Sequence, residues 1–187
     1  MSSVYRPLPA TAEPPAASLW ATRLAGEWRL LAALAELNPE RMTGLRQEDN
    51  TFHLTLRDVP ALTRSGGIER THALRIEFPE YFPAMPMELY LDRPMQHPNI
   101  HPDTGFMCLW DRHRATHTCE VALHKAVAIL TWTLHNSAQV HVMQPAALAS
   151  MKEKGDSVRA QLACTPLTGL TPPVMSPVTM PRRRRLS

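Results

Sequence analysis

The chain has 187 residues, with 20 Lys or Arg and 17 Asp or Glu, and its sequence pI is near 9.0. This length allows one domain with a hydrophobic core, and no apolar run is long enough to cross a bilayer. The basic excess is local: residues 151–187 hold seven Lys or Arg and two acidic residues, and no aromatic residues interleave the run Arg182–Arg185. We therefore expect a solvated tail and no membrane partner. A nucleic-acid-binding adaptor that acts through the arginine run is a weaker alternative.

Residues 1–17 are rich in Pro and Ala, which predicts a flexible arm. The arm lacks a basic start followed by an apolar run, so we expect no secretory signal in it. The three cysteines, Cys108, Cys119 and Cys164, form neither an even set nor a Cys-x-x-Cys pair. This usage favours a reducing compartment, and we expect a soluble cytoplasmic protein.

The first predicted element is a helix over residues 18–37. Ser18 is a suitable N-cap, and Asn38-Pro39 ends the pattern. Large apolar residues recur at steps of three and four and predict one buried face: Trp20, Leu24, Trp28, Leu31 and Leu34.

The apolar period then changes to two. Alternation over 52–56, 74–78 and 87–91 predicts three strands with one buried face, and a weaker first strand is expected over 42–48. Residues 60–70 are expected to form a turn, because they contain Ser-Gly-Gly. Four strands joined by short turns predict an antiparallel meander with the first helix on one face.

The remaining chain contains one long and one short predicted helix. Three prolines make residues 78–86 irregular. A largely buried helix is expected over 119–135, and a short one over 146–154. From residue 155 onward, prolines and arginines with few large apolar residues predict a disordered tail. The predicted organisation is thus an arm (1–17), one domain (18–154) and a tail (155–187).

The segment from His97 to Trp110 carries the clearest functional signal. It reads His-Pro-Asn-Ile-His-Pro-Asp-Thr-Gly-Phe-Met-Cys-Leu-Trp. Prolines stiffen the loop that carries Asn99, and Gly105 favours a turn. Cys108 follows between apolar residues. A buried core cysteine is the alternative to a reactive one, and the preceding His-Pro-Asn favours the reactive thiol.

This segment resembles the active-site segment of ubiquitin-conjugating enzymes, in which His-Pro-Asn precedes a glycine turn and Cys-Leu. Phe78 to Pro86 looks like the family's Tyr-Pro-Phe-x-Pro-Pro turn. The order of elements matches the family from Ser18 to His135. The resemblance implies an α+β, UBC-like fold: an N-terminal helix, a four-stranded antiparallel meander, an active-site loop and a long central helix.

Three departures accompany the resemblance. The step from Asn99 to Cys108 is nine residues, one longer than usual. Residues 111–117 replace the expected Trp and Ser-Pro, and the two C-terminal helices of eukaryotic members are expected to be truncated after Gln144. The pattern is similar to divergent bacterial members of the superfamily. Such members work beside a ubiquitin-like protein, an activating enzyme and often a metallopeptidase.

The resemblance implies a role for each motif residue. Cys108 would carry a thioester, because a thiolate attacks an incoming acyl group and thioesters react readily with amines. The Asn99 amide would stabilise the oxyanion, or alternatively pin the loop by binding its backbone. His97 is expected chiefly to order the loop, with a direct catalytic role as the minor reading.

A base must also take the proton of the incoming amine. Residues 135–142, where the family often has an acidic residue, hold no carboxylate. By chemistry alone, the candidate bases are Asp111, His113, His117 and His135.

The predicted function is a carrier that accepts a ubiquitin-like protein from an activating enzyme on Cys108 and transfers it to an amine of an unknown target protein, with no cofactor of its own. The main alternative is a non-catalytic UBC-like module that holds a modifier or partner. A structural zinc is a weaker alternative. The four-residue spacing of His97 and His101 would suit two metal ligands on a helix, but Pro98 and Pro102 prevent a helix there. We therefore expect no metal. The zinc alternative would use His97, His101, Cys108, His113, His117 and Cys119.

Overall fold

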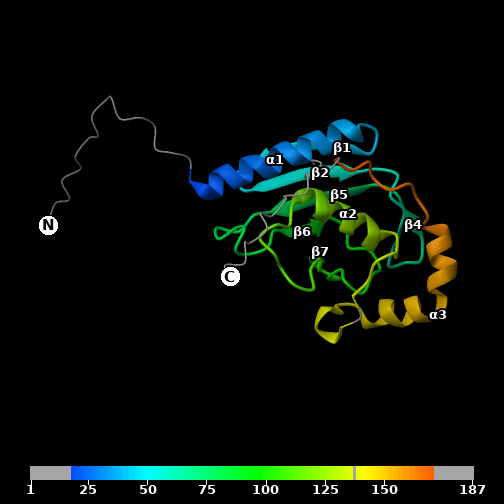
Figure 1. The fold of residues 1–187 in the computed structure, drawn as a ribbon. Helices are drawn as coiled ribbons and strands as arrows, with labels where there is room; N and C mark the ends of the chain where they lie inside the picture. The colour runs from blue at the N-terminus through cyan, green and yellow to red at the C-terminus, as the bar shows by residue number, and fades with distance from the viewer. Residues whose placement is uncertain (1–17, 137, 171–187) are drawn as a thin grey trace, which may run out of the picture.

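The structure is a computed structural model that describes residues 18–136 and 138–170 (Figure 1). The predicted arm at 1–17 and the arginine run at 182–185 lie outside these residues. Within the described residues, no helix is both long and apolar enough to cross a membrane.

Helix α1 (Leu19–Leu37) begins at the predicted cap. The Ser18 hydroxyl oxygen accepts from the backbone N–H of Ala21 at 3.1 Å. Leu31 and Leu34 on its predicted apolar face are fully buried. The helix ends at Asn38, whose side-chain amide donates to the Leu34 carbonyl at 2.8 Å. Local sequence signals therefore set both ends of this helix.

The main sheet is antiparallel and has five strands in the order β1-β2-β5-β6-β7. The first four confirm the predicted meander. The fifth comes from the active-site loop and is only two residues long, too short for alternation to reveal. The strand bounds are β1 Met42–Glu48, β2 Thr51–Leu56, β5 His72–Glu77, β6 Glu88–Leu91 and β7 Phe106–Met107.

A row of buried side chains crosses this sheet. Phe52 lies opposite Ile76, Ile76 opposite Leu89, and Leu89 opposite Met107. All four are at most 1% exposed. The row ties the short strand β7, one residue before Cys108, directly into the core, because cross-strand pairs on one face stabilise neighbouring strands.

Residues 60–70 differ from the simple turn that we expected. They contain a second, two-stranded sheet made of β3 (Ala61–Leu62) and β4 (Ile68–Glu69), with the glycines at its tip. The Thr63 hydroxyl oxygen accepts from the Gly67 N–H at 2.9 Å, which closes the tip.

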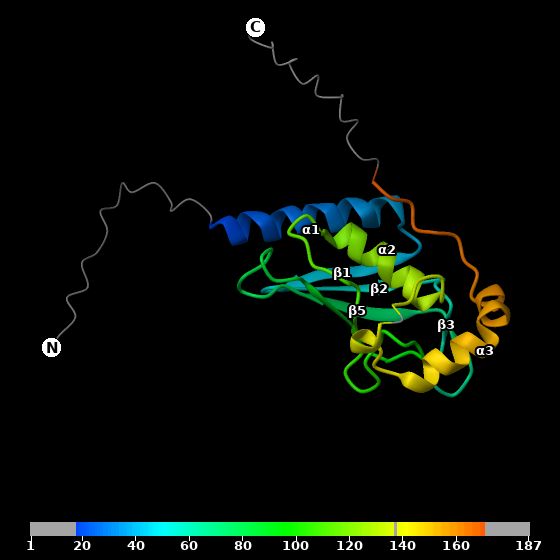
Figure 2. The ribbon, with the colours of Figure 1, turned by 60° about the horizontal axis from the view of Figure 1, so that its bottom comes forward.

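Helices α1 and α2 (Cys119–Leu130) lie on the same face of the sheet (Figure 2). The α2 helix is shorter than the predicted 119–135. It stops because the Thr131 hydroxyl donates to the Val127 carbonyl at 2.8 Å and Trp132 takes a left-handed backbone with φ of 58°. Trp132 is nevertheless buried, while Leu134 leaves the predicted apolar line and is 37% exposed.

The C-terminal part corrects two expectations. Helix α3 runs over Pro145–Gln161, so the helix expected over 146–154 is longer and the tail does not begin at residue 155. Residues 162–170 then pack back on the domain. Leu162 and Leu167 are buried, and the Arg41 guanidinium donates to the carbonyls of residues 165 and 166. Proline content suggested disorder here, but two leucines and this arginine anchor the backbone.

Candidate active site

The His-Pro-Asn loop is held by the side chain of its own histidine. His97 Nδ1 accepts from the backbone N–H of Asn99, and Nε2 donates to the Leu134 carbonyl, both at 3.1 Å. Burial lowers the pKa of His97 to about 3, and the nearby His135 acts in the same direction. His97 is therefore neutral at neutral pH, and its two ring nitrogens are occupied in ordering the loop.

The chain then turns at Gly105 and returns as β7. Gly105 has a φ of 73° and lies so close to Leu91 that a Cβ atom would collide with the Leu91 carbonyl. After the turn, the backbone N–H of Cys108 donates to the Asn99 carbonyl at 2.8 Å. The asparagine and the cysteine, nine residues apart in sequence, are thus held side by side by the backbone.

The Asn99 side chain forms hydrogen bonds with a second segment, at Asn136 and at His141. Its oxygen accepts from the Asn136 N–H at 2.8 Å. Its amide nitrogen donates to the carbonyls of Asn136, at 3.1 Å, and His141, at 3.0 Å. Asn99 is 1% exposed. Both amide hydrogens are therefore used in positioning the neighbouring segment.

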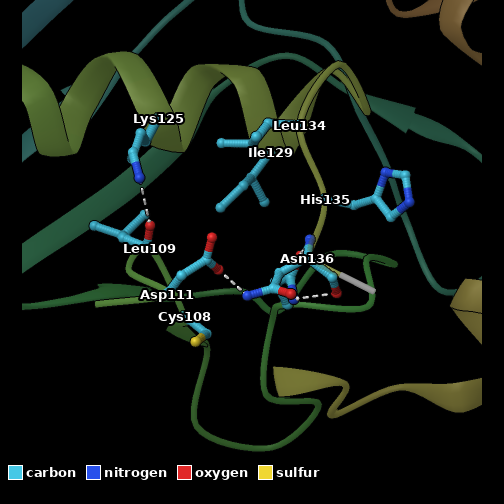
Figure 3. A pocket seen from close by; sticks show the side chains of 9 residues that line it. Cys108, Leu109, Asp111, Lys125, Ile129, Leu134, His135 and Asn136 are labelled. Carbon is cyan, nitrogen blue, oxygen red and sulfur yellow. Dashed lines mark hydrogen bonds between the residues drawn. The ribbon is translucent and has the colours of Figure 1, made fainter. Parts of the chain in front are cut away.

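A pocket of about 160 Å³ opens beside Cys108 (Figure 3). Its wall comes from the active-site loop, from α2 and from the segment after α2. The lining residues are Asn99, Cys108, Leu109, Asp111, Lys125, Ile129, Leu134, His135 and Asn136. The active-site loop, α2 and the segment that follows α2 thus meet at one thiol.

Cys108 is half-buried at this pocket, and an imidazole lies against it. The Sγ atom is 3.1 Å from Nδ1 of His141, a residue of the short 3-10 helix η1 (Gln139–His141). Burial raises the pKa of the Cys108 thiol; the Asp111 carboxylate also raises it, while Lys125 lowers it. The resting group is therefore a thiol whose proton has an acceptor within hydrogen-bonding distance.

The candidate bases do not share one location. Asp111 lines the pocket and accepts from the side-chain amide of Asn136. His135 also lines it. His113 and His117 do not: His113 bonds through Nε2 to the Pro83 carbonyl at 2.7 Å, and His117 stacks on Trp110 with ring centroids 4.0 Å apart.

Two further residues at the site were not among the sequence candidates. Lys125, on α2, donates to the Leu109 carbonyl at 3.0 Å and lies 4.9 Å from the centroid of the Trp110 ring. His141 lies 33 residues after Cys108. Its only sequence signal is that it falls within 135–142, where the family resemblance implies an acidic residue.

Within residues 18–136 and 138–170, no group of three or more His, Cys, Asp or Glu side chains lies close enough together to hold a metal ion. The ligands of the zinc alternative are separated: Cys119 is fully buried in the core, and His97 bonds to backbone. The chemistry that this geometry supports is nucleophilic: a thiol, a neighbouring imidazole and amide groups beside an open pocket.

Sequence comparison alone finds no relative: no protein-family model and no curated protein match the chain. Solved structures do match. A protein described as a ubiquitin-conjugating enzyme from Trypanosoma cruzi superposes with a TM-score of 0.56 at 12% identity, covering 75% of this chain and 95% of that one. The ubiquitin-conjugating enzyme Pex4p of H. polymorpha, solved with the soluble domain of Pex22p, gives 0.56 at 16% identity, covering 78% and 94%.

A third structure, described as a ubiquitin-conjugating enzyme from Plasmodium yoelii, gives a TM-score of 0.52 at 20% identity, with 78% of this chain and 91% of that chain covered. The helix, antiparallel sheet and further helices of this chain are thus the ubiquitin-conjugating-enzyme fold, as predicted. Identities this low show the fold and leave the chemistry to the residues of the site.

Proposed function

We propose that this chain is a ubiquitin-conjugating-like carrier enzyme. It accepts the C-terminus of a ubiquitin-like protein from an activating enzyme as a thioester on Cys108, and it transfers that acyl group to an amine of a target protein. The observation that carries the proposal is the position of Cys108: a half-buried thiol at the edge of a pocket, backbone-bonded to Asn99, on a ubiquitin-conjugating fold.

The site residues divide into a nucleophile and its supports. Cys108 forms the new bond to the modifier's terminal carbonyl carbon. His97 orders the loop, because both ring nitrogens are engaged with backbone. Asn99 positions Asn136 and His141, and it donates to a developing oxyanion only when it releases a bond to one of them.

The pocket suits the end of an extended polypeptide tail. Its polar groups include Asp111, Lys125 and Asn136, which can bind backbone N–H and carbonyl groups. The proposed partners are therefore a ubiquitin-like modifier, an activating enzyme and a target protein. Kinship with bacterial members and a cytoplasmic location remain predictions.

A charging assay tests the proposal. The protein is incubated with ATP, an activating enzyme and its ubiquitin-like modifier, and adducts are resolved with and without reducing thiol. We expect a thiol-sensitive adduct that Cys108→Ser abolishes or converts to a thiol-resistant ester. Cys164→Ser is the matched control and should charge normally, since Cys164 lies near Arg41, away from the pocket.

The non-catalytic alternative has a distinct outcome in the same experiment. A module that only holds the modifier would co-elute with it and form no adduct in either buffer. Charging that survives Cys108→Ser and disappears in Cys119→Ser would also refute the proposal, because the nucleophile would then be Cys119, which is fully buried in this structure.

A further inference from the structure

We infer that His141 is the general base of this site: its Nδ1 takes the proton of the Cys108 thiol as the sulfur attacks an acyl group. For the identity of the acyl group, the inference rests on the proposed function. The proton transfer itself is a property of two side chains and is testable without any modifier.

The first support is geometric. Cys108 Sγ and His141 Nδ1 are 3.1 Å apart, and with the ring proton on Nε2 the thiol donates to Nδ1. A nucleophile hydrogen-bonded to an imidazole is the arrangement that activates weakly acidic nucleophiles.

The second support is that the fold holds the imidazole in place. The carbonyl of His141 accepts from the Asn99 side chain at 3.0 Å, and its N–H donates to Ala138 at 2.9 Å. Two residues later, the N–H of Met143 donates to the Pro98 carbonyl at 2.7 Å. The His-Pro-Asn loop therefore fixes η1 on one side and Cys108 on the other.

The third support is the electrostatic need for a base. Burial and Asp111 raise the pKa of the Cys108 thiol, so less thiolate is present at neutral pH than for a free cysteine. Lys125 opposes this, but its ammonium donates to the Leu109 carbonyl. His135 is the remaining titratable group on the pocket wall. His141 alone among these groups makes a hydrogen bond with the sulfur within the described residues.

The charging step balances as follows. The Cys108 sulfur bonds to the modifier's carbonyl carbon as its proton moves to His141 Nδ1. The carbon–sulfur bond to the activating enzyme's cysteine breaks, and the departing thiolate recovers a proton from the imidazolium or from water. In the discharge step, the amine nitrogen of the target bonds to the carbonyl carbon, and the carbon–sulfur bond to Cys108 breaks. The His141 imidazole takes the proton of the amine and returns it to the departing Cys108 thiolate, a role for which residues 135–142 offer no carboxylate.

The test that needs no modifier is alkylation with iodoacetamide from pH 6 to pH 10, followed by peptide mass spectrometry of each cysteine. His141→Gln is compared with His53→Gln, an identical change on strand β2 away from the pocket. At pH 7 we expect Cys108 of His141→Gln to react about tenfold more slowly, with the difference closing above the thiol's own pKa. Cys164 in the same molecules serves as an internal reference.

The pH dependence of alkylation in the wild-type chain is a second test of the inference. The alkylation rate of its Cys108 should exceed a single-thiol titration curve below pH 8, whereas the rate of Cys164 should follow such a curve. Superimposable Cys108 profiles for the wild-type chain and His141→Gln, or a wild-type profile that fits one thiol, would overturn the inference.

Charging separates this inference from the proposed function. His141→Gln should charge about 100-fold more slowly at pH 7, and His53→Gln at the wild-type rate. If alkylation depends on His141 but no modifier is ever accepted, the proposed function fails and the thiol–imidazole pair stands. If His141→Gln charges at the wild-type rate, the assignment of His141 as a base is wrong and the carrier function stands.

Discussion

Two cysteines of this chain show how strongly neighbouring residues decide what a thiol can do. Cys108 is half-buried at a pocket and lies against the His141 imidazole. Cys119 begins helix α2, is fully buried, and has its N–H bonded to the Glu27 carboxylate at 2.7 Å. Burial and Glu27 raise the pKa of Cys119 well above its usual range. The same side chain is a candidate nucleophile in one region and an inert core residue in the other.

The two regions are also stabilised differently. Around Cys119, the buried Glu27 carboxylate pairs with Arg23, one turn earlier on α1, at 3.0 Å, and it also accepts from the N–H of Cys119 at the start of α2. Arg23 in turn donates to the Ala115 carbonyl. Around Cys108, side chains of one loop bind backbone groups of another, with Asn99 as the main donor. Loss of the Glu27 carboxylate should therefore act on global stability alone, whereas changes around Cys108 should act on the position of the site as well as on stability.

The largest expected effect is on the turn before Cys108. Gly105→Ala should lower the free energy of unfolding by about 4 kcal/mol, because it adds both a left-handed strain and a collision with the Leu91 carbonyl. Urea denaturation measures the loss. Gly66→Ala is the matched control: its φ is 88° but a Cβ meets nothing within 4 Å, so about 1 kcal/mol is expected. Equal losses would contradict the close-contact account.

The next largest loss of stability is expected at Glu27, which bonds to the Cys119 N–H. Glu27→Gln should destabilise the fold by about 3 kcal/mol, because it leaves Arg23 without its buried partner and weakens the bond to the Cys119 N–H. The exposed pair Arg46–Glu48 provides the comparison, and Glu48→Gln should change stability by less than about 0.5 kcal/mol. A small effect at Glu27 would mean that its carboxylate, with its bonds to Arg23 and to the Cys119 N–H, does not stabilise the contact between α1 and α2.

Acid should weaken the Cys108 region through His97. Its pKa is about 3 when folded and 6.5 when unfolded, so between these values the unfolded chain binds a proton that the folded chain does not. The contribution of neutral His97 to the free energy of unfolding is fully present above pH 6.5, and it falls by about 1.4 kcal/mol for each pH unit below that value. Burial also lowers the pKa of His72, which adds to the loss. Urea denaturation at pH 7 and pH 5 measures the slope, and His97→Gln should flatten it.

The smallest effect on stability is expected at Asn99. Asn99→Ala should cost about 1.5 kcal/mol, because the Asn136 N–H loses its acceptor. Hydrogen exchange should accelerate at Asn136 and at residues 138–143, and it should stay unchanged in β2 and β5. Cys108 should also lose much of its reactivity at pH 7, since His141 is no longer held. Unchanged hydrogen exchange at Asn136 would show that the hydrogen bonds of the Asn99 side chain do not hold Asn136 in place.

The strongly periodic elements could be predicted from sequence, and the tertiary contacts could not. Helix α1 and the alternating strands follow from local patterns, since their apolar faces repeat regularly. Strand β7 and the packing of Leu167 escape such reasoning, because two residues have no period and a lone leucine has no pattern. At the site, the motif placed Cys108 beside Asn99, but His141 is brought to the sulfur only by hydrogen bonds across 33 residues.

The most direct test of the central claim is a protection experiment on the charged protein. The chain is incubated with activating enzyme, ubiquitin-like modifier and ATP, then treated with iodoacetamide, and labelling of each cysteine is measured by peptide mass spectrometry. The account predicts that Cys108 is protected only when ATP is present, that reducing thiol restores its labelling, and that Cys164 is labelled throughout. Labelling of Cys108 to the same extent with and without ATP, in a sample where the modifier is attached to the chain, would contradict it.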